Sequence, residues 1–264
     1  MSTILLAGDS WGIGVFEGSG DNYGPIGKGP ASILQDLGHT VINISKAGGS
    51  NWLMIDRMED KWYDTKNCLW GHSATDEYKH INWESIDYIV FLQTDIFREH
   101  YRYVKKTPDA EFTQWKELDH IFVDSLMQHS SLSNMIDDYF YKFYTKLNEI
   151  AQQHNKQVLM LGCWSQLHPS INQYSNLISV VHSATKLLIP ELTEDVYLSD
   201  PEWYSQLADT PEFMHKFSTE FKLMSIIDAN KLALIYSNWK EVHPTITGYA
   251  KLVDQILPYF GKPS

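Results

Sequence analysis

Short apolar runs that alternate with helical stripes of apolar residues constrain the fold of this chain more than any other feature. The run IDYIVFLQT, residues 86–94, carries almost no polar alternation, as is typical of a strand that is covered on both faces. Further strands are predicted at Thr3–Ala7, 40–44, 157–164 and 232–236. Strands that alternate with helices predict an α/β fold with a parallel, doubly wound sheet.

Three segments have the apolar spacing of helices that pack against such a sheet. Residues 31–39 predict a short helix that ends at Gly38. Residues 133–155 and 245–260 predict two longer, amphipathic helices. The side chains expected to face the core are Ile136, Phe140, Phe143, Leu147 and Ile150 in the first of these, and Ile246, Tyr249, Val253, Ile256 and Phe260 in the second.

The 264 residues are expected to form one domain, 1–264, with two insertions. Residues 52–85 are rich in Trp, Tyr, Asp and Lys, and residues 165–230 contain two helical patterns and a loop. Neither segment fits the simple alternation of strands and helices. Both are therefore predicted to be aromatic-rich insertions between elements of the core.

Charge and cysteine content exclude several classes of function. The formal net charge of −12 disfavours non-specific binding to nucleic acid or to an anionic membrane surface. Cys68 and Cys163 lack the spacing of a zinc site or a disulfide framework and are expected to be buried thiols. With no signal peptide and no apolar run long enough to span a membrane, a cytoplasmic location is expected.

The first predicted strand runs into an unusual turn, in the sequence ILLAGDSWGIG of residues 4–14. Gly8, Asp9 and Ser10 are common turn residues, so a plain turn explains them. A serine at the carboxyl end of a buried strand is also where α/β proteins place a nucleophile. GDSWG fits the Gly-x-Ser-x-Gly elbow of α/β-hydrolases as well, although that elbow normally follows several strands rather than the first.

Four segments together resemble the motifs of the SGNH/GDSL hydrolase family. They are GDS at 8–10, KAGGSN at 46–51, QTD at 93–95 and EVHPTITGY at 241–249. The resemblance covers residues 3 to about 100 and about 230 to 260. It implies a three-layer α/β/α fold with a parallel, flavodoxin-like sheet, and a serine esterase acting on a small acyl ester, with carbohydrate O-acetyl esters as one candidate.

The resemblance is partial. Asn43 and Gly48 fall where the second motif of the family has its asparagine and glycine. In the third motif, Thr94 replaces the family's asparagine, and only Asp95 is kept. The last motif keeps His243, but Lys240 stands where the family has its acid.

The resemblance implies catalytic roles for a few of these residues. Ser10 would be the nucleophile and His243 its general base, as a dyad held by a backbone carbonyl or as a triad with Glu241. The backbone N–H groups of Ser10 and Gly48 would form the oxyanion hole.

Supporting roles are expected for four further side chains. Thr94 would be a weaker third donor to the oxyanion, while strand alternation would point Gln93 away. Asp9 and Asp95 are supporting residues of the site, and Trp11 is expected near the substrate.

Two functions follow from this sequence. The first is an ester hydrolase that needs no cofactor and no metal and whose partner is a small-molecule or carbohydrate ester. The second is a degenerate member of the family that has lost catalysis and serves as a binding or structural module. The oligomeric state is not predicted.

Overall fold

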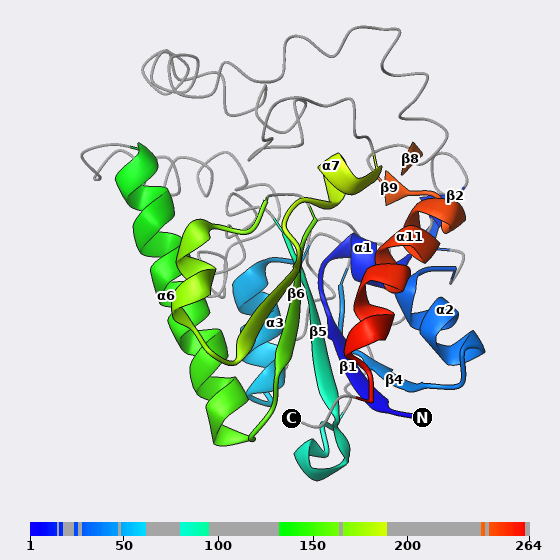
Figure 1. The fold of residues 1–264 in the computed structure, drawn as a ribbon, viewed down its shortest axis with the longest axis horizontal. Coiled ribbons are helices and arrows are strands. Elements are labelled where there is room, and N and C mark those ends of the chain that lie inside the picture. Colours follow the sequence, from blue (N-terminus) through cyan, green and yellow to red (C-terminus); the bar gives the residue numbers. More distant parts are fainter. Residues whose placement is uncertain are drawn as a thin grey trace, which may run out of the picture.

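The computed structural model describes residues 1–14, 16–17, 24–25, 28–46, 49–61, 80–94, 132–163, 166–188, 239–240 and 243–261. A sheet of five parallel strands lies at its centre (Figure 1). The strands are β1 (Thr3–Ala7), β4 (Thr40–Asn43), β5 (Tyr88–Gln93), β6 (Val158–Gly162) and β7 (Leu177–Val181).

The spatial order of these strands is β4-β1-β5-β6-β7. Counted along the chain, this is the order 2-1-3-4-5 of flavodoxin-like sheets. The chain leaves β1 toward one side of the sheet and later returns to its other side with β5. The carboxyl ends of β1 and β5 therefore flank the topological switch point, where open α/β sheets bind their ligands.

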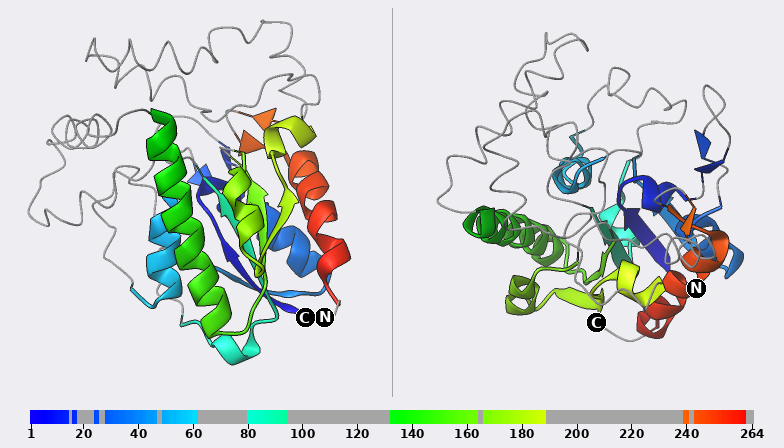
Figure 2. Two further views of the ribbon diagram at one scale, coloured as in Figure 1. Left: turned by 60° about the vertical axis from the view of Figure 1, so that its left-hand side comes forward. Right: turned by 90° about the horizontal axis from the view of Figure 1, so that it is seen from above.

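Helices cover both faces of the sheet and complete three layers (Figures 1 and 2). One face carries α3 (Asn51–Met58) and α6 (Leu132–Gln153), and the other carries α2 (Pro30–Asp36) and α11 (Ile246–Ile256). The shorter described elements are α1 (Ser10–Ile13), α7 (Ala184–Leu188), the 3-10 helices η2 (Trp83–Ser85), η5 (Pro169–Gln173) and η6 (Leu257–Tyr259), and the strand pairs β2 (Phe16–Glu17) with β3 (Gly24–Pro25) and β8 (Trp239–Lys240) with β9 (His243–Pro244).

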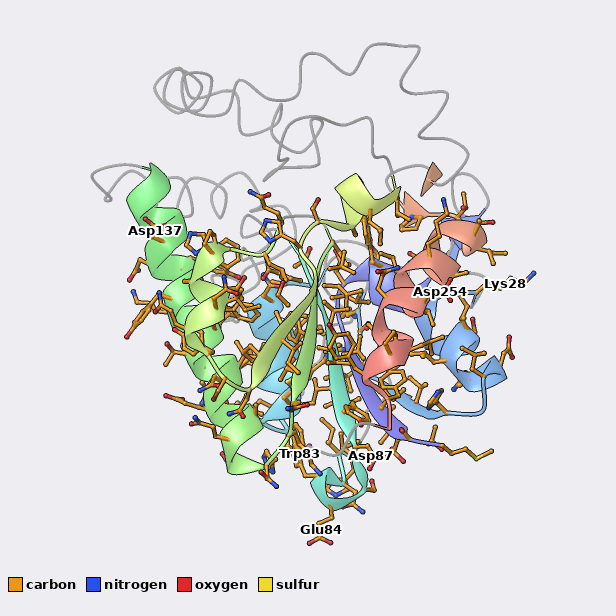
Figure 3. The ribbon with its side chains drawn as sticks, in the orientation of Figure 1. Lys28, Trp83, Glu84, Asp87, Asp137 and Asp254 are labelled. Carbon is orange, nitrogen blue, oxygen red and sulfur yellow. The ribbon has the colours of Figure 1, made fainter. Side chains whose placement is uncertain are left out.

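Alternate side chains of the central strands fill two apolar layers. In β5, Phe91 packs with the layer of α3 and α6, whereas Leu92 packs with the layer of α2 and α11. All six residues of β5 are buried, because both faces of this strand are covered. Side chains fill the space between sheet and helices, while charged residues such as Asp254 and Lys28 lie at the periphery (Figure 3).

The structure confirms the α/β fold and four of the five predicted strands. The predicted strand at 232–236 lies outside the described residues. The three predicted helices are present as α2, α6 and α11. Ile246 was expected to face the core, but its side chain is 45% exposed, since it occupies the first turn of α11 beyond the edge of the apolar layer.

The predicted insertions need correction at two places. Within 52–85, most of α3 belongs to the core, because Leu53, Met54 and Ile55 are buried against the sheet. Within 165–230, β7 is the edge strand of the central sheet and pairs in parallel with β6. Both segments thus contribute core elements, and residues 62–79 and 189–230 lie outside the described part.

None of the helices in the described part of the chain is both long and apolar enough to span a membrane.

Candidate active site

The turn after β1 places Ser10 at the first position of α1. Asp9 is the residue before the helix, and its Oδ1 accepts a hydrogen bond from the backbone N–H of Trp11 at 2.9 Å. This is an N-cap interaction, which satisfies a helix donor that has no intrahelical acceptor. Ser10 is 5% exposed and lies just beyond the carboxyl end of β1, beside the switch point.

Two glycines of this turn are required by close packing. A Cβ atom at Gly8 would lie 2.8 Å from the Cβ of Leu92 in the neighbouring strand β5. A Cβ at Gly12 would lie 2.0 Å from the Oγ of Ser45, which follows β4. The glycines around Ser10 therefore let α1 lie directly against the ends of both neighbouring strands, which a plain surface turn does not require.

The segment after β4 is fastened to the Ser10 turn. The Nδ2 of Asn43 donates to the carbonyl oxygen of Gly12 at 2.8 Å, and the N–H of Lys46 donates to the carbonyl oxygen of Gly8 at 3.0 Å. Asn43 was matched to the family's second motif, and here it holds α1 in place. Gly48, the predicted oxyanion donor of this motif, lies outside the described residues.

Thr94 follows β5 and contacts Asp9. Its Oγ1 donates to the Oδ2 of Asp9 at 2.8 Å, so the single hydroxyl proton of Thr94 points at a carboxylate. Gln93 faces the opposite side, where its Oε1 accepts from the hydroxyl of Tyr144 and its Nε2 donates to the carbonyl oxygen of Gln166. The predicted orientation of Gln93 is confirmed. Asp95 lies outside the described residues.

His243 lies in β9, a two-residue strand that pairs with β8 and precedes α11. This strand lies against α1, the helix that begins with Ser10. The backbone of His243 is described but its side chain is not, so contact between His243 and Ser10 stays a prediction. Glu241 lies outside the described residues, in the connection between β8 and β9.

Trp11 requires a correction. It was expected near the substrate, but its side chain is 0% exposed and belongs to the apolar layer that also contains Leu34 and Tyr249. The position of Trp11 on α1, between the sheet and α2, accounts for this burial. The residue after Ser10 is therefore a core residue.

Cys163 lies at the carboxyl end of β6 and is a free, buried thiol. Burial raises the pKa of this thiol well above its usual value, and the nearby carboxylate of Asp9 raises it further. A protonated, inaccessible thiol is a poor nucleophile. Cys68 lies outside the described residues. In the described ranges, no three His, Cys, Asp or Glu side chains are grouped as metal ligands.

Two buried polar side chains beside this site are not singled out by the sequence. Asn51 hydrogen-bonds the backbone of Thr94, and Arg57 donates from Nη1 to the carbonyl oxygens of Ile44 and Ser45 at 2.7 and 3.4 Å. Both lie on α3: Arg57 falls inside the predicted insertion 52–85, and Asn51 is the last residue of the KAGGSN segment directly before it. The signal that could have found Arg57 is its place among apolar residues in NWLMIDRM, since a charge buried in a core needs a partner.

The strand order and the two helical layers define this chain as a three-layer α/β/α protein with a flavodoxin-like sheet and a serine at its switch point. No protein-family model matches the sequence, and no curated protein sequence matches it either. The structure is similar to several solved ones, among them three proteins of low sequence identity.

The crystal structure of TesA is 14% identical, covers 98% of each chain and has a TM-score of 0.36. A member of the lipolytic protein G-D-S-L family from Veillonella parvula is 14% identical, with full coverage of both chains and a TM-score of 0.37. The psychrotrophic esterase EstA from Pseudoalteromonas sp. is 11% identical, covers 99% of this chain and 100% of its own, and has a TM-score of 0.37.

Proposed function

We propose that this chain is a serine ester hydrolase of the SGNH type that cleaves a small acyl ester, with Ser10 as nucleophile and His243 as general base. The observation that carries the proposal is the placement of the two residues. Ser10 begins α1 at the switch point of the sheet, and the strand that contains His243 lies against the same short helix. Segments from opposite ends of the sequence therefore lie together at the carboxyl-terminal end of the central strands.

The proposed reaction has two stages. His243 accepts the proton of the Ser10 hydroxyl while Oγ attacks the ester carbonyl, and the tetrahedral intermediate collapses as His243 returns the proton to the leaving alcohol. Water, deprotonated by His243, then attacks the acyl-enzyme and releases the carboxylic acid. Ser10 regains its proton from the histidine.

The oxyanion hole in this proposal consists of backbone donors. The N–H of Ser10 and the N–H of Gly48 would face the developing charge, each contributing about 3 kcal/mol or more. Thr94 is not included as a third donor, because its hydroxyl proton is engaged by Asp9. Asp9 and Asp95 keep supporting roles, Asp9 as the cap of the Ser10 helix.

The nucleophile is tested with a fluorophosphonate probe and with short-chain p-nitrophenyl esters. Wild-type protein should be labelled on Ser10 and should hydrolyse the esters, whereas Ser10→Ala should do neither. Ser85→Ala is the matched control, because Ser85 is an exposed serine of η2, which precedes β5 and so lies at the opposite, amino-terminal end of the sheet. Labelling that survives Ser10→Ala would show that another residue is the nucleophile.

The group that orients His243 is tested with Glu241→Gln. If the carboxylate of Glu241 holds the imidazole, this change should lower kcat by several orders of magnitude, about 10⁴-fold where an acid fixes the tautomer. If a backbone carbonyl holds it, kcat should be nearly unchanged.

The competing function is a binding or structural module that has lost catalysis. The engagement of Thr94 with Asp9 favours this function, since no amide stands where the family has its third oxyanion donor. A folded wild-type protein that neither reacts with the probe nor cleaves any of the esters would support it.

A further inference from the structure

A chain of hydrogen bonds at the carboxyl end of β5 joins the sheet to α3 and α6, the two helices on one of its faces. The Nδ2 of Asn51, on α3, donates to the hydroxyl oxygen of Tyr139, on α6, and to the carbonyl oxygen of Thr94, each at 3.0 Å. The Oδ1 of the same amide accepts from the N–H of Thr94 at 2.9 Å. The side chain of Asn51 therefore hydrogen-bonds both the backbone N–H and the backbone C=O of Thr94.

Thr94, held by Asn51, is in turn hydrogen-bonded to the turn that contains Ser10. Thr94 Oγ1 donates to one carboxylate oxygen of Asp9 at 2.8 Å, and the other oxygen accepts from the N–H of Trp11 at 2.9 Å. These hydrogen bonds of Asp9 thus connect the residue before Ser10 to Thr94 and to the residue after Ser10. Where Thr94 places its hydroxyl determines where Asp9, and with it the start of α1, can lie.

Burial makes this chain of contacts rigid. Asn51, Thr94 and Asp9 are each only 1% exposed. A buried polar group that loses its partner cannot recover a hydrogen bond from bulk water, which makes alternative positions of these side chains costly. An exposed asparagine at the same position would exchange its hydrogen-bond partners for water and would not hold Thr94 in one position.

We infer that Asn51 is a positioning residue for the Ser10 nucleophile, acting through Thr94 and Asp9. This inference rests on the proposed function. Asn51 reaches no reacting atom in this arrangement, because its amide is used by Thr94 and Tyr139. Its effect is to hold Ser10 in the position and orientation from which Oγ can attack the ester carbonyl. A misplacement of about 1 Å can lower the rate on the order of 10²-fold.

The test measures kcat and KM for p-nitrophenyl acetate in Asn51→Ala. The expected result is a kcat lowered by about tenfold to 10²-fold with KM changed less than about twofold, because the position of the nucleophile changes and the substrate contacts do not. The rate of Ser10 phosphonylation by the fluorophosphonate should fall in parallel.

A double-mutant cycle distinguishes positioning from general destabilisation. Thr94→Val keeps the shape of the side chain and the backbone contacts with Asn51 but removes the hydroxyl that reaches Asp9. Thr94→Val should lower kcat, and Asn51→Ala should have little further effect in that background, since its route to Ser10 is already cut. Independent, multiplying effects on kcat would overturn the inference.

Tyr144→Phe is the matched control for lost stability. Tyr144 is fully buried and its hydroxyl hydrogen-bonds Gln93 and the N–H of His168, on the side of β5 that faces away from Asp9. Its free energy of unfolding should fall while kcat remains that of the wild type. Should Asn51→Ala fail to fold, Asn51→Asp takes its place, because it keeps the shape and the acceptor for the Thr94 N–H while it replaces the amide donor by a carboxylate oxygen and adds a negative charge.

The two failures are distinguishable. Wild-type protein that neither labels nor cleaves the ester overturns the proposed function, and the inference with it. Active wild-type protein in which Asn51→Ala, or Asn51→Asp, retains full kcat overturns the inference alone. A kcat loss in Tyr144→Phe as large as that in Asn51→Ala would also overturn it, because lost stability would then explain both.

Discussion

The hydroxyl of Tyr249 donates a hydrogen bond of 3.3 Å to the carbonyl oxygen of Gly14, 235 positions earlier in the chain. Tyr249 lies on α11, which follows His243, and Gly14 is the C-cap of α1, which begins with Ser10. The hydrogen bond therefore joins the two helices that flank the proposed nucleophile and base. It is buried, so water does not compete for it.

Removal of this hydroxyl should destabilise the fold. Tyr249→Phe leaves the carbonyl of Gly14 without this donor and should lower the free energy of unfolding by about 1–3 kcal/mol, measured by urea denaturation. Tyr141→Phe is the control, because Tyr141 is largely exposed on α6 and should cost almost nothing. Equal changes in the two variants would show that the Tyr249 hydrogen bond contributes no stability.

Replacement of Ser45, unlike that of Tyr249, should not lower the free energy of unfolding. The Oγ of Ser45 is buried and makes no hydrogen bond among the described residues, although it lies against Gly12. Ser45→Ala removes an unsatisfied polar atom and should leave stability unchanged or raise it by up to about 1 kcal/mol in thermal unfolding.

Gly12→Ala provides the contrast, because the added Cβ would overlap the Oγ and Cβ of Ser45. It should lower stability by about 1–3 kcal/mol. A clear loss of stability in Ser45→Ala would mean that the hydroxyl has a partner in solution.

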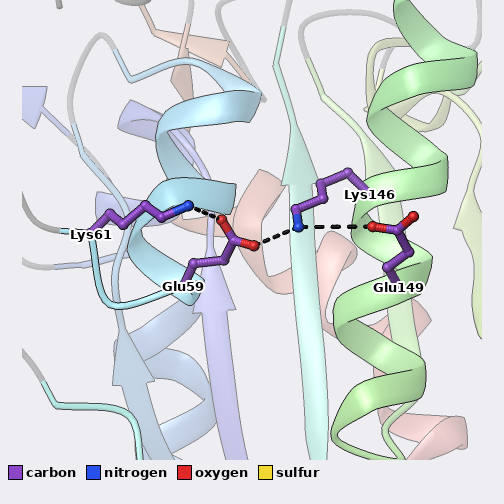
Figure 4. Close-up of polar contacts among 4 residues, drawn as sticks. All are labelled: Glu59, Lys61, Lys146 and Glu149. Carbon is purple, nitrogen blue, oxygen red and sulfur yellow. Dashed lines mark hydrogen bonds and ion pairs between the residues drawn. The ribbon is translucent and has the colours of Figure 1, made fainter.

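Stability should depend on pH through Glu59, which joins α3 to α6 (Figure 4). Glu59 pairs with Lys61 and Lys146, each at 2.5 Å, and Lys146 also lies 3.8 Å from Glu149. Partial burial raises the pKa of Glu59, but hydrogen bonds and charge from Lys146 and Lys61 outweigh it, and the pKa lies below the usual 4.5. The contribution of Glu59 to stability is thus present above the unfolded-state pKa and is lost as the pH falls through the folded-state pKa.

Glu59→Gln should accordingly be less stable than the wild type at neutral pH, by up to about 1 kcal/mol, and the difference should shrink toward zero in acid. Urea denaturation at about pH 7 and about pH 3.5 measures both values, on either side of the ordinary glutamate pKa. Glu149→Gln is the control, because Glu149 is more exposed and farther from Lys146. A difference for Glu59→Gln that grows in acid would contradict the assignment.

The elements with a strong local signal were predicted correctly. The predicted bounds of the first strand, Thr3–Ala7, are those observed for β1. The apolar run at 86–94 contains β5, a strand that is covered on both faces as predicted. On α6, Phe140, Phe143, Leu147 and Ile150 are all buried as its stripe predicted. In each case the apolar period is carried by residues close together in sequence, which is where pattern analysis is informative.

The errors concern relations between distant segments. The run at 177–181 has strand-forming residues, but no local pattern shows that it pairs with β6 rather than belonging to an insertion. Asn51 was missed for the same reason, because its two contacts with Thr94 span 43 positions. Thr94 was assigned to the oxyanion by analogy, and the sequence alone does not reveal that its hydroxyl donates a hydrogen bond to Asp9.

The contact between Gly8 and Leu92 has a consequence for anyone who would redesign this protein by random mutagenesis. A Cβ at position 8 would lie 2.8 Å from the Cβ of Leu92. Any single substitution of Gly8 therefore produces a steric overlap with the Cβ of a residue in β5. A library that varies position 8 alone should yield folded clones with glycine almost exclusively. Every residue except glycine carries a Cβ, so only combinatorial libraries that also place glycine at position 92 can search for a different residue at position 8.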